Sequence, residues 1–447
     1  MSGDNDNEYF SDGIAEEILN ALAQVDGLRV AGRTSSFYFK GKNEDLAVIG
    51  DKLHVATLLE GSVRKSGNRV RITAQLINAR DGFHLWSKQY DRELTDIFKV
   101  QGELALAVVD ALKVKLLSGA AAAPRVHEAR DPEAHRLLLL GRSQNFRQTA
   151  ESLAQAAANL AKAVAIDPAY APAWHMLSIV HGNLALNAPR SEIPRRAQEA
   201  LAEVDRAIAI DGDFAEALGT RGWIRGNLLW DWPGAKADLQ RALQLNPRSE
   251  GVLHTYAGFV TKAGRLSESI ALLRKAAELD PLDAYIWTNL GANLMQDGQL
   301  GPAREAFFRA EEVSPHNELA AASLLLLDLL EGHPAKALDA AGKLPDKPLR
   351  LLNIAIAQHE LGHARESAAA LDALVAKVPS DEPDVAYWVA AVHAWRGERD
   401  QAFEWLETAY KRRELRLRML RVEPHFRSLR GDPRLLALLK KMNLPLD

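Results

Sequence analysis

A proline-terminated pattern recurs through the middle of this chain and constrains its fold more than any other feature. Between residues 130 and 410, helix-forming stretches end in an Asp-Pro-like step and then begin again, and Pro168, Pro247, Pro281 and Pro315 mark these ends. The last two intervals are 34 residues each, and Pro168 to Pro247 spans two units with an insertion. A fixed period of this size is typical of stacked repeats, in which each unit buries its apolar face against its neighbours.

The unit that ends at Pro315 shows how one repeat is built. Trp287, Leu290 and Leu294 are three and four residues apart, so they share one face of a first helix. Gly298 supplies a turn, and a second helix with the same spacing runs on to the proline, which cannot continue it. Each unit is therefore predicted to be a helical hairpin that cannot bury its apolar face alone.

Equivalent small and apolar positions can be aligned along most of the array. They are Ala156, Leu160 and Ala163; Gly222, Ala235 and Leu239; Gly264, Leu273 and Ala276; Gly332 and Ala337; Gly362, Leu371 and Leu374; and Gly397, Ala402 and Leu406. Taken together they resemble the tetratricopeptide (TPR) family over about 60% of the chain. The resemblance implies an all-α superhelix, an α-solenoid of about eight hairpins over residues 131–410. About ten extra residues at 187–196 depart from the pattern, and Gly212 stands where proline is usual.

The first 115 residues have a different periodicity. Residues 14–25 carry apolar residues at helical spacing, with Ser11 or Asp12 as the expected N-cap and Gly27 as the stop, and residues 28–31 suggest a short strand. Residues 46–53 suggest a second helix, and residues 57–64, 69–78 and 83–90 alternate as strands do. Turns are expected at 66–68 and 81–82, and a third helix follows, with Thr95 or Asp96 as its cap. This part is predicted to be an α+β sandwich.

Several stretches of this part resemble the TolB-type N-terminal domain of bacterial TPR proteins. They are residues 8–14 (EYFSDGI), 59–64 (LEGSVR), 69–77 (RVRITAQLI), and 84–86 (HLW) followed by 90–92 (YDR). The resemblance implies a domain that follows a signalling module, commonly a class III adenylate cyclase, a winged-helix DNA-binding domain or a protein kinase. In the family, an apolar strand precedes the segment that matches Met1 to Asp4. We therefore expect a missing first strand and a possible effector domain upstream.

The chain is accordingly divided into four parts. We expect the TolB-type domain at residues 1–117, a linker at 118–130, the TPR array at 131–410 and a capping region at 411–447, which includes an apolar helix from Arg434 to Met442.

Composition limits the classes of function. The formal net charge is -4, which provides no excess of positive charge for a nucleic acid backbone. The absence of cysteine excludes disulfides, thiolate nucleophiles and cysteine-ligated zinc. Because no apolar run reaches the length of a membrane span, we expect a cytoplasmic protein, or a periplasmic one if a membrane helix lies upstream.

One literal motif points to catalysis. His359-Glu360-Leu361-Gly362-His363 matches the H-E-x-x-H pattern of zinc peptidases, in which two histidines one helical turn apart bind the metal. That geometry needs an unbroken helix, whereas the repeat register places Gly362 at a turn. A zinc metalloprotease therefore remains an unfavoured alternative, and we expect no catalytic residue, metal site or cofactor.

Two charged clusters have less specific explanations. Glu16-Glu17 on the first helix is expected to lie on a solvated face rather than to act in acid-base chemistry. Arg64, Lys65, Arg69 and Arg71 gather at the hairpin, where a solvated sheet edge is favoured over contact with nucleic acid or phospholipid.

The favoured function is a non-catalytic interaction scaffold that binds a protein or peptide in the groove of the superhelix. The alternative is the C-terminal sensory part of an adenylate cyclase or winged-helix regulator whose effector domain lies outside this chain. By register, the residues expected to face the groove are His175, Asn183, Asn227, His254, Thr255, Lys262, Asn289 and Gln296.

Overall fold

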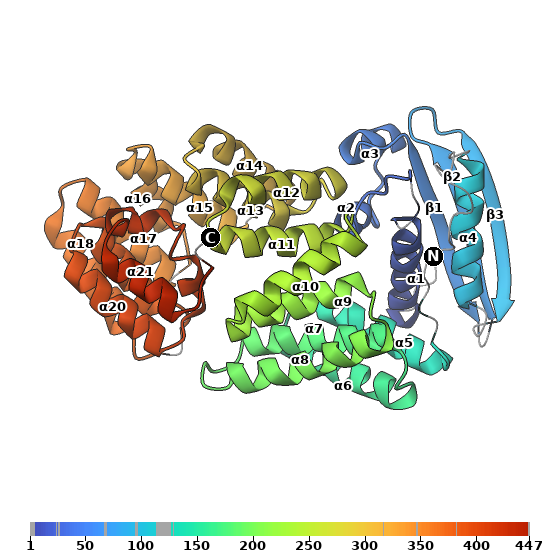
Figure 1. The fold of residues 1–447 in the computed structure, drawn as a ribbon. Helices are drawn as coiled ribbons and strands as arrows, with labels where there is room; N and C mark the ends of the chain where they lie inside the picture. Colours follow the sequence, from blue (N-terminus) through green and yellow to red (C-terminus); the bar gives the residue numbers. More distant parts are fainter. Residues whose placement is uncertain are drawn as a thin grey trace.

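A computed structural model of the chain shows a small sheet-containing part, a curved array of paired helices and a C-terminal segment folded onto the end of the array (Figure 1). The structure describes residues 5–23, 25, 27–66, 69–93, 97–112, 127, 129–315, 317–345, 347–380 and 382–445.

The sheet has three antiparallel strands in the order β1 (Thr57–Ser66), β2 (Arg69–Asn78) and β3 (His84–Glu93). Along β2, every second side chain from Val70 to Leu76 is buried, as the alternating sequence predicts. Gly82 lies in the β2–β3 turn at φ +72°, a conformation that glycine adopts without strain. The second predicted hairpin turn is therefore confirmed. Most of the first, at residues 66–68, lies outside the described residues.

Helices α1 (Asn5–Ala23) and α4 (Ile97–Ala111) cover one face of this sheet. Phe10 and Ile14 from α1 and Leu104 from α4 pack into one core with the buried side chains of β2. The shorter α3 (Leu46–Leu53) is capped by the Asp45 carboxylate, which accepts a hydrogen bond from the Ala47 amide. The α+β sandwich is therefore confirmed.

Two local predictions in this part are wrong. The first helix begins at Asn5 rather than after Ser11 or Asp12, because Phe10 joins the core and extends the apolar stripe by one turn. Residues 28–31 form no strand; they run beside the repeats, where the Gly32 amide donates to the Leu279 carbonyl at 2.7 Å. The proposed caps of α4, Thr95 and Asp96, and most of the 118–130 segment lie outside the described residues.

The rest of the described chain up to residue 411 forms eight consecutive helical hairpins. The hairpins are α5 (Pro132–Phe146) with α6 (Ala150–Ile166), α7 (Ala171–Leu186) with α8 (Ile193–Ile210), α9 (Ala215–Ile224) with α10 (Trp232–Leu245), α11 (Glu250–Lys262) with α12 (Leu266–Leu279), α13 (Ala284–Gln296) with α14 (Leu300–Val313), α15 (Glu318–Leu330) with α16 (Pro334–Gly342), α17 (Pro348–Glu360) with α18 (Ala364–Ala376), and α19 (Val385–Trp395) with α20 (Arg399–Lys411).

Glycine sets the close packing and the turn of the hairpin α13–α14. A Cβ atom built on Gly291 would lie 2.6 Å from the Phe307 ring, so only glycine lets the two helices approach this closely. Gly298 lies in the turn at φ +83°. The turn predicted at Gly298 is therefore confirmed.

The irregular stretch is confined to the second and third hairpins. The extra residues at 187–196 lengthen the α7–α8 loop and the start of α8. A π-helical turn, η2 (Arg225–Leu229), extends α9 and ends at Trp230, which has the left-handed φ of 60°. The pairing of helices continues through both irregularities.

The C-terminal segment consists of two 3-10 helices, η3 (Leu415–Met419) and η4 (Pro424–Leu429), and the helix α21 (Pro433–Lys441). Its apolar side chains share a core with α19 and with α10 and α11, far earlier in the array. The Trp232 indole donates to the Met442 carbonyl at 3.1 Å. An α+β part followed by a TPR-like solenoid is therefore confirmed as the fold class.

A second long-range contact joins the sheet-containing part to the middle of the array. The Asp280 carboxylate, at the end of α12, accepts hydrogen bonds from the Ser35 amide at 2.7 Å and the Thr34 amide at 3.2 Å. These amides belong to the first turn of α2 (Arg33–Tyr38), whose own N-cap position, Gly32, has no side chain. A repeat-terminal aspartate therefore caps a helix of the preceding part.

Candidate functional site: the inner surface of the repeat array

The first helices of successive hairpins lie next to one another and form the inner surface of the curve. In Figure 1, the second helices α12 and α14 lie along the upper edge and α6 and α8 along the lower edge, with α9 and α11 between these two arms. We call the exposed and half-buried side chains of α5, α7, α9, α11 and α13 that face this interior the inner surface.

Polar side chains of neighbouring hairpins are hydrogen-bonded to each other across the inner surface. Three such pairs join successive first helices. The pairs are Asn183 with Asn145 at 3.1 Å, His175 with Thr220 at 2.8 Å, and Asn289 with His254 at 2.9 Å. The side chains are therefore held in fixed positions before any ligand is present.

Three of the other four predicted groove residues donate to carbonyl groups of their own helices. Asn227 donates to the Trp223 carbonyl, Thr255 to the Gly251 carbonyl and Lys262 to the Gly258 carbonyl. The side-chain oxygen of Gln296 is buried without a hydrogen-bond partner among the described residues. The predicted set of eight thus contains four residues that take part in the inter-repeat pairs and four separate side chains.

The two inner-surface histidines are neutral at physiological pH. Burial, with the charge of Arg142 nearby, lowers the pKa of His175 to about 3, and burial lowers the pKa of His254 to about 4. Each neutral ring offers one donor and one acceptor, which suits it to hydrogen bonding and not to proton transfer near neutral pH.

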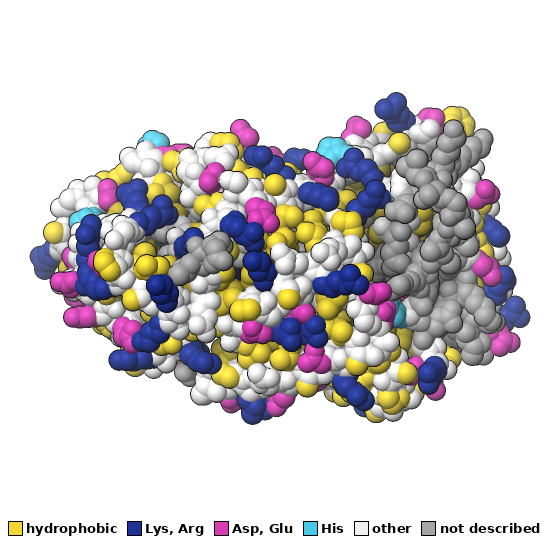
Figure 2. Space-filling model, viewed as in Figure 1, with side chains coloured by type: hydrophobic (Ala, Val, Ile, Leu, Met, Phe, Trp, Pro, Cys, Tyr) yellow, Lys and Arg dark blue, Asp and Glu magenta, His cyan; other side chains and the backbone are white. Residues whose placement is uncertain are grey.

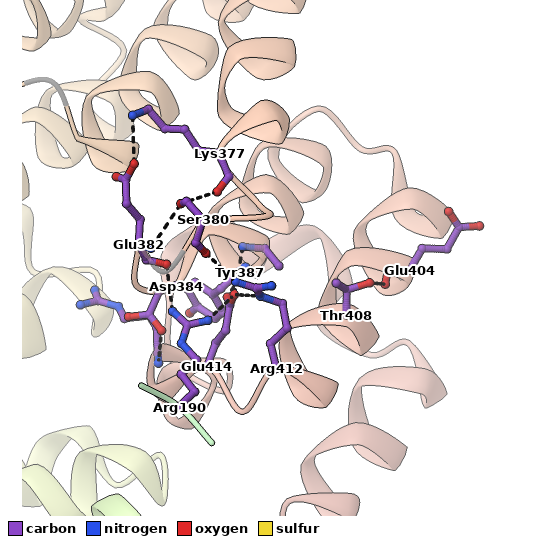
Figure 3. Close-up of polar contacts among 12 residues, drawn as sticks. Arg190, Lys377, Ser380, Glu382, Asp384, Tyr387, Glu404, Thr408, Arg412 and Glu414 are labelled. Carbon is purple, nitrogen blue, oxygen red and sulfur yellow. Dashed lines mark hydrogen bonds and ion pairs between the residues drawn. The ribbon is translucent and has the colours of Figure 1, made fainter. Parts of the chain in front are cut away.

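Part of the inner surface is covered by the C-terminal segment. The Arg418 guanidinium, from η3, donates to the Asn227 carbonyl at 3.3 Å. A close-packed cluster of polar groups holds this segment in place (Figure 3). At its centre the fully buried Glu414 carboxylate accepts from the Tyr387 amide at 2.8 Å, and from Arg190 of the inserted α7–α8 loop at 3.0 Å. The insertion therefore links the second hairpin to the end of the array.

The opposite side of the inner surface is bordered by α1 and α2. Arg33 pairs with Glu16 at 2.6 Å and lies over the ring of Phe146, 4.9 Å from its centroid. Glu17 lies beside Arg142 and His135 of α5, at 3.6 and 3.5 Å. The expectation of a solvated Glu16-Glu17 face is therefore wrong, because α1 packs against the first hairpin and both carboxylates are paired there.

The H-E-x-x-H segment is a turn between two helices, as the repeat register predicts. His359 lies at the end of α17, Gly362 has a φ of +78°, and His363 precedes α18 with its Nδ1 atom 2.7 Å from the Gln358 amide oxygen. Glu360 accepts a hydrogen bond from the Trp395 indole. The two histidines are therefore not on one face of one helix.

A different group of potential metal ligands, Asp328, Glu331 and His333, lies on the α15–α16 turn. Both carboxylates bind Arg304 at 2.6 Å, and Lys336 lies 3.0 Å from Asp328. Because these cations already neutralise the carboxylates, we assign no metal to this group.

The basic residues of the sheet are on the solvent side, as predicted. Arg64 and Arg69 are exposed, and Arg71 pairs with Asp91 of β3 at 2.8 Å. The side chain of Lys65 lies outside the described residues. On the face of the molecule in Figure 2, Lys and Arg side chains are interspersed with acidic and hydrophobic ones rather than gathered into one basic surface.

Comparisons with known proteins agree with the repeat architecture. Residues 231–294 match the sequence model of the tetratricopeptide repeat family. The chain is 41% identical over 201 residues to a protein of Rhizobium meliloti (strain 1021) named putative adenylate cyclase 3. The match covers 45% of this chain and 34% of that protein, so this chain spans about a third of the relative's length.

Two solved structures resemble part of the array. The type IV pilus biogenesis factor PilW is 23% identical, covering 45% of this chain and 94% of its own, with a TM-score of 0.39. A tetratricopeptide repeat protein from Parabacteroides merdae ATCC 43184 is 13% identical, covering 58% and 98%, with a TM-score of 0.41. The family match at residues 231–294 confirms the tetratricopeptide resemblance, whereas the TolB-type resemblance stays a prediction.

Sequence analysis missed several inner-surface residues. Thr220 lies two residues before Gly222, as Asn289 lies two before Gly291, and could have been found by extending the alignment to every first helix. Asn145 lies four residues after Gly141, a position that the predicted residues do not share. Arg418 comes from outside the repeats, in the segment Arg416-Leu417-Arg418, whose two arginines were the available signal. Its approach to α11 depends on the curvature of the whole array.

Proposed function

We propose that this chain is a non-catalytic scaffold that binds a protein or peptide segment on the inner surface of its repeat array. The observation that carries the proposal is the set of inter-repeat hydrogen bonds, above all His254 with Asn289. Side chains fixed in this way lose little conformational entropy when a ligand arrives, and preorganisation of this kind raises affinity.

The chemistry of the inner surface suits an extended segment. Amide and imidazole side chains such as Asn183, Asn227, Asn289 and His254 can donate to and accept from the peptide groups of a ligand, and first helices of solenoids commonly provide such concave surfaces. Their neutral state keeps these contacts constant across physiological pH.

A peptide-display experiment tests the proposal. A random peptide library is selected on the full chain, and the affinity of the selected peptide is measured for the double variant His254→Ala/Asn289→Ala. We expect an affinity loss of at least about tenfold, or 1.4 kcal/mol. The control Lys236→Ala changes an exposed residue of the second helix α10 and should bind normally. Equal binding by the double variant would refute the proposal.

Binding without turnover is part of the same proposal. The purified chain is expected neither to hydrolyse peptides nor to convert ATP to cyclic AMP, and measurable turnover in either assay contradicts it.

A second candidate function is favoured by the 41% identity to the protein named putative adenylate cyclase 3. In this alternative the chain is the sensory part of a longer bacterial signalling protein, with a cyclase or winged-helix effector encoded upstream. The genomic sequence immediately before Met1 distinguishes the two, because an upstream reading frame without an effector leaves only the scaffold.

The proposal also includes the division of the chain into a TolB-type domain (1–117), a linker (118–130), the array (131–410) and a cap (411–447). It places the protein in the cytoplasm, or in the periplasm if a membrane helix lies upstream. Among the described residues, no helix has both the length and the apolar character required to cross a membrane. Limited proteolysis at 113–130 tests the division.

A further inference from the structure

The face of α11 that belongs to the inner surface carries few bulky side chains. Gly251, Thr255, Gly258 and Lys262 are four and three residues apart and share this face. A Cβ atom on Gly251 would meet nothing within 4 Å, and one on Gly258 would meet only the Lys262 Nζ atom, at 3.5 Å. Glycine inside a helix costs about 1 kcal/mol relative to alanine, and its usual benefit is to let another group approach the backbone.

Lys262 is a buried cation at the C-terminal end of this face of α11. The residue is 8% exposed, and its ammonium group donates to the Gly258 carbonyl of its own helix at 2.7 Å. Among the described residues, no carboxylate lies within ion-pair distance of it. An ammonium group has three donors, so this one retains capacity to bind an acceptor above Gly258.

The C-terminal segment brings a second cation to the same place. Arg418 reaches the Asn227 carbonyl on the neighbouring first helix, and its charge acts on Lys262. Burial, and then the charge of Arg418, lowers the pKa of Lys262 to about 7. Burial also lowers the pKa of Arg418, although Asp384 nearby acts in the opposite direction. Asp384 itself is engaged by the Arg416 amide at 3.0 Å.

The other end of α11 is surrounded by acidic side chains. Burial, with Asp280, Asp283 and Glu216 nearby, raises the pKa of Glu250 to about 7. Glu250 and Lys262 are the first and last residues of the helix, so they are about 18 Å apart along its axis. An acidic group on the inner surface is repelled from the Glu250 end and attracted to the Lys262 end.

We propose that the peptide ligand places an acidic group, a side-chain or terminal carboxylate, over Gly258 between Lys262 of α11 and Arg418 of the C-terminal segment. The carboxylate supplies the counter-charge that the buried Lys262 lacks among the described residues and adds one for the half-buried Arg418, and the open space over Gly251 and Gly258 accommodates it. The site is composite, since half of its charge comes from outside the repeats. This inference rests on the proposed function and adds the charge and position of the ligand.

Isothermal titration calorimetry with hexaglutamate tests the site, with hexaglutamine amidated at its C-terminus as the control that carries no carboxylate. Hexaglutamate is expected to bind the full chain at least about tenfold more tightly than hexaglutamine, and less tightly at high salt. Lys262→Met and Arg418→Gln should each remove this preference. Lys236→Met, on the exposed face of α10, should keep it.

Folding is checked separately, because Lys262→Met removes an uncompensated buried charge and is expected to raise the melting temperature. Equal binding of the two peptides, or a preference unchanged by both variants, overturns the site. A display-selected peptide that depends on His254 and Asn289, carries no acidic residue and binds equally well with an amidated C-terminus also overturns it while leaving the scaffold function intact. Failure of every peptide to bind would instead count against both.

Discussion

Removing the Glu414 side chain tests whether its carboxylate holds the C-terminal segment against the repeat array. This fully buried carboxylate accepts from the Tyr387 and Ala386 amides at 2.8 and 3.3 Å, and from Arg190 and Arg412 at 3.0 and 3.2 Å (Figure 3). Glu414→Ala leaves two buried amides and two half-buried guanidinium groups without this acceptor.

The expected loss for Glu414→Ala is about 3–5 kcal/mol, the usual result of removing one partner from a buried charged network. Glu414→Gln keeps one acceptor and should lose about 1–2 kcal/mol. Glu404→Ala is the matched control, since Glu404 lies one element earlier on α20 with its side chain directed to solvent (Figure 3). It should change stability by less than about 0.5 kcal/mol.

Hydrogen exchange is the appropriate assay, because repeat arrays open locally and a single unfolding free energy is not well defined for them. The Ala386 and Tyr387 amides should exchange at least about a hundredfold faster in Glu414→Ala than in the wild type. Exchange at these two amides that matches the Glu404→Ala control would refute the reasoning.

Three further predictions concern packing and charge. Asp280→Ala should cost about 2–3 kcal/mol and speed exchange at the α2 amides, because two buried donors lose their acceptor; unchanged exchange would contradict the cap. The raised pKa of Glu250 means that its carboxyl group binds a proton more tightly in the folded state than in the unfolded state. The free energy of unfolding of the wild type, measured in urea, should therefore fall by about 1–3 kcal/mol between pH 4.5 and 7 relative to that of Glu250→Gln. Parallel pH profiles of the two proteins would show that the group is solvated. Gly291→Ala should lower the melting temperature through overpacking worth about 1–3 kcal/mol, whereas Gly301→Ala, with open space around it, should leave it unchanged or raise it; equal effects would contradict the close approach.

The repeat pattern predicted the fold of the array because each hairpin is specified locally. Gly298 and Gly362 fall at turns, and the spacing of Trp287, Leu290 and Leu294 defines a helix face whichever neighbours pack on it. The same register also showed that His359 and His363 could not share a helix.

The misses have a common physical origin in contacts between distant segments. Glu16 and Glu17 look solvent-exposed until α1 is packed on α5. Residues 28–31 resemble a strand in sequence, but no strand forms there, and the next residue, Gly32, donates its amide to the Leu279 carbonyl of α12. Arg418 meets Asn227, 191 residues earlier, only because the superhelix curves far enough to bring its end back. Local periodicity contains no information about such curvature.

Photo-crosslinking of a display-selected peptide tests the binding surface most directly. A benzophenone amino acid is placed at position 285, where the exposed Tyr285 ring lies beside His254, or, as a control, at position 69 on the solvent side of β2. We expect the peptide to crosslink at position 285 and not at position 69. Crosslinking at position 69 alone, or equally at both, would contradict the assignment of ligand binding to the inner surface.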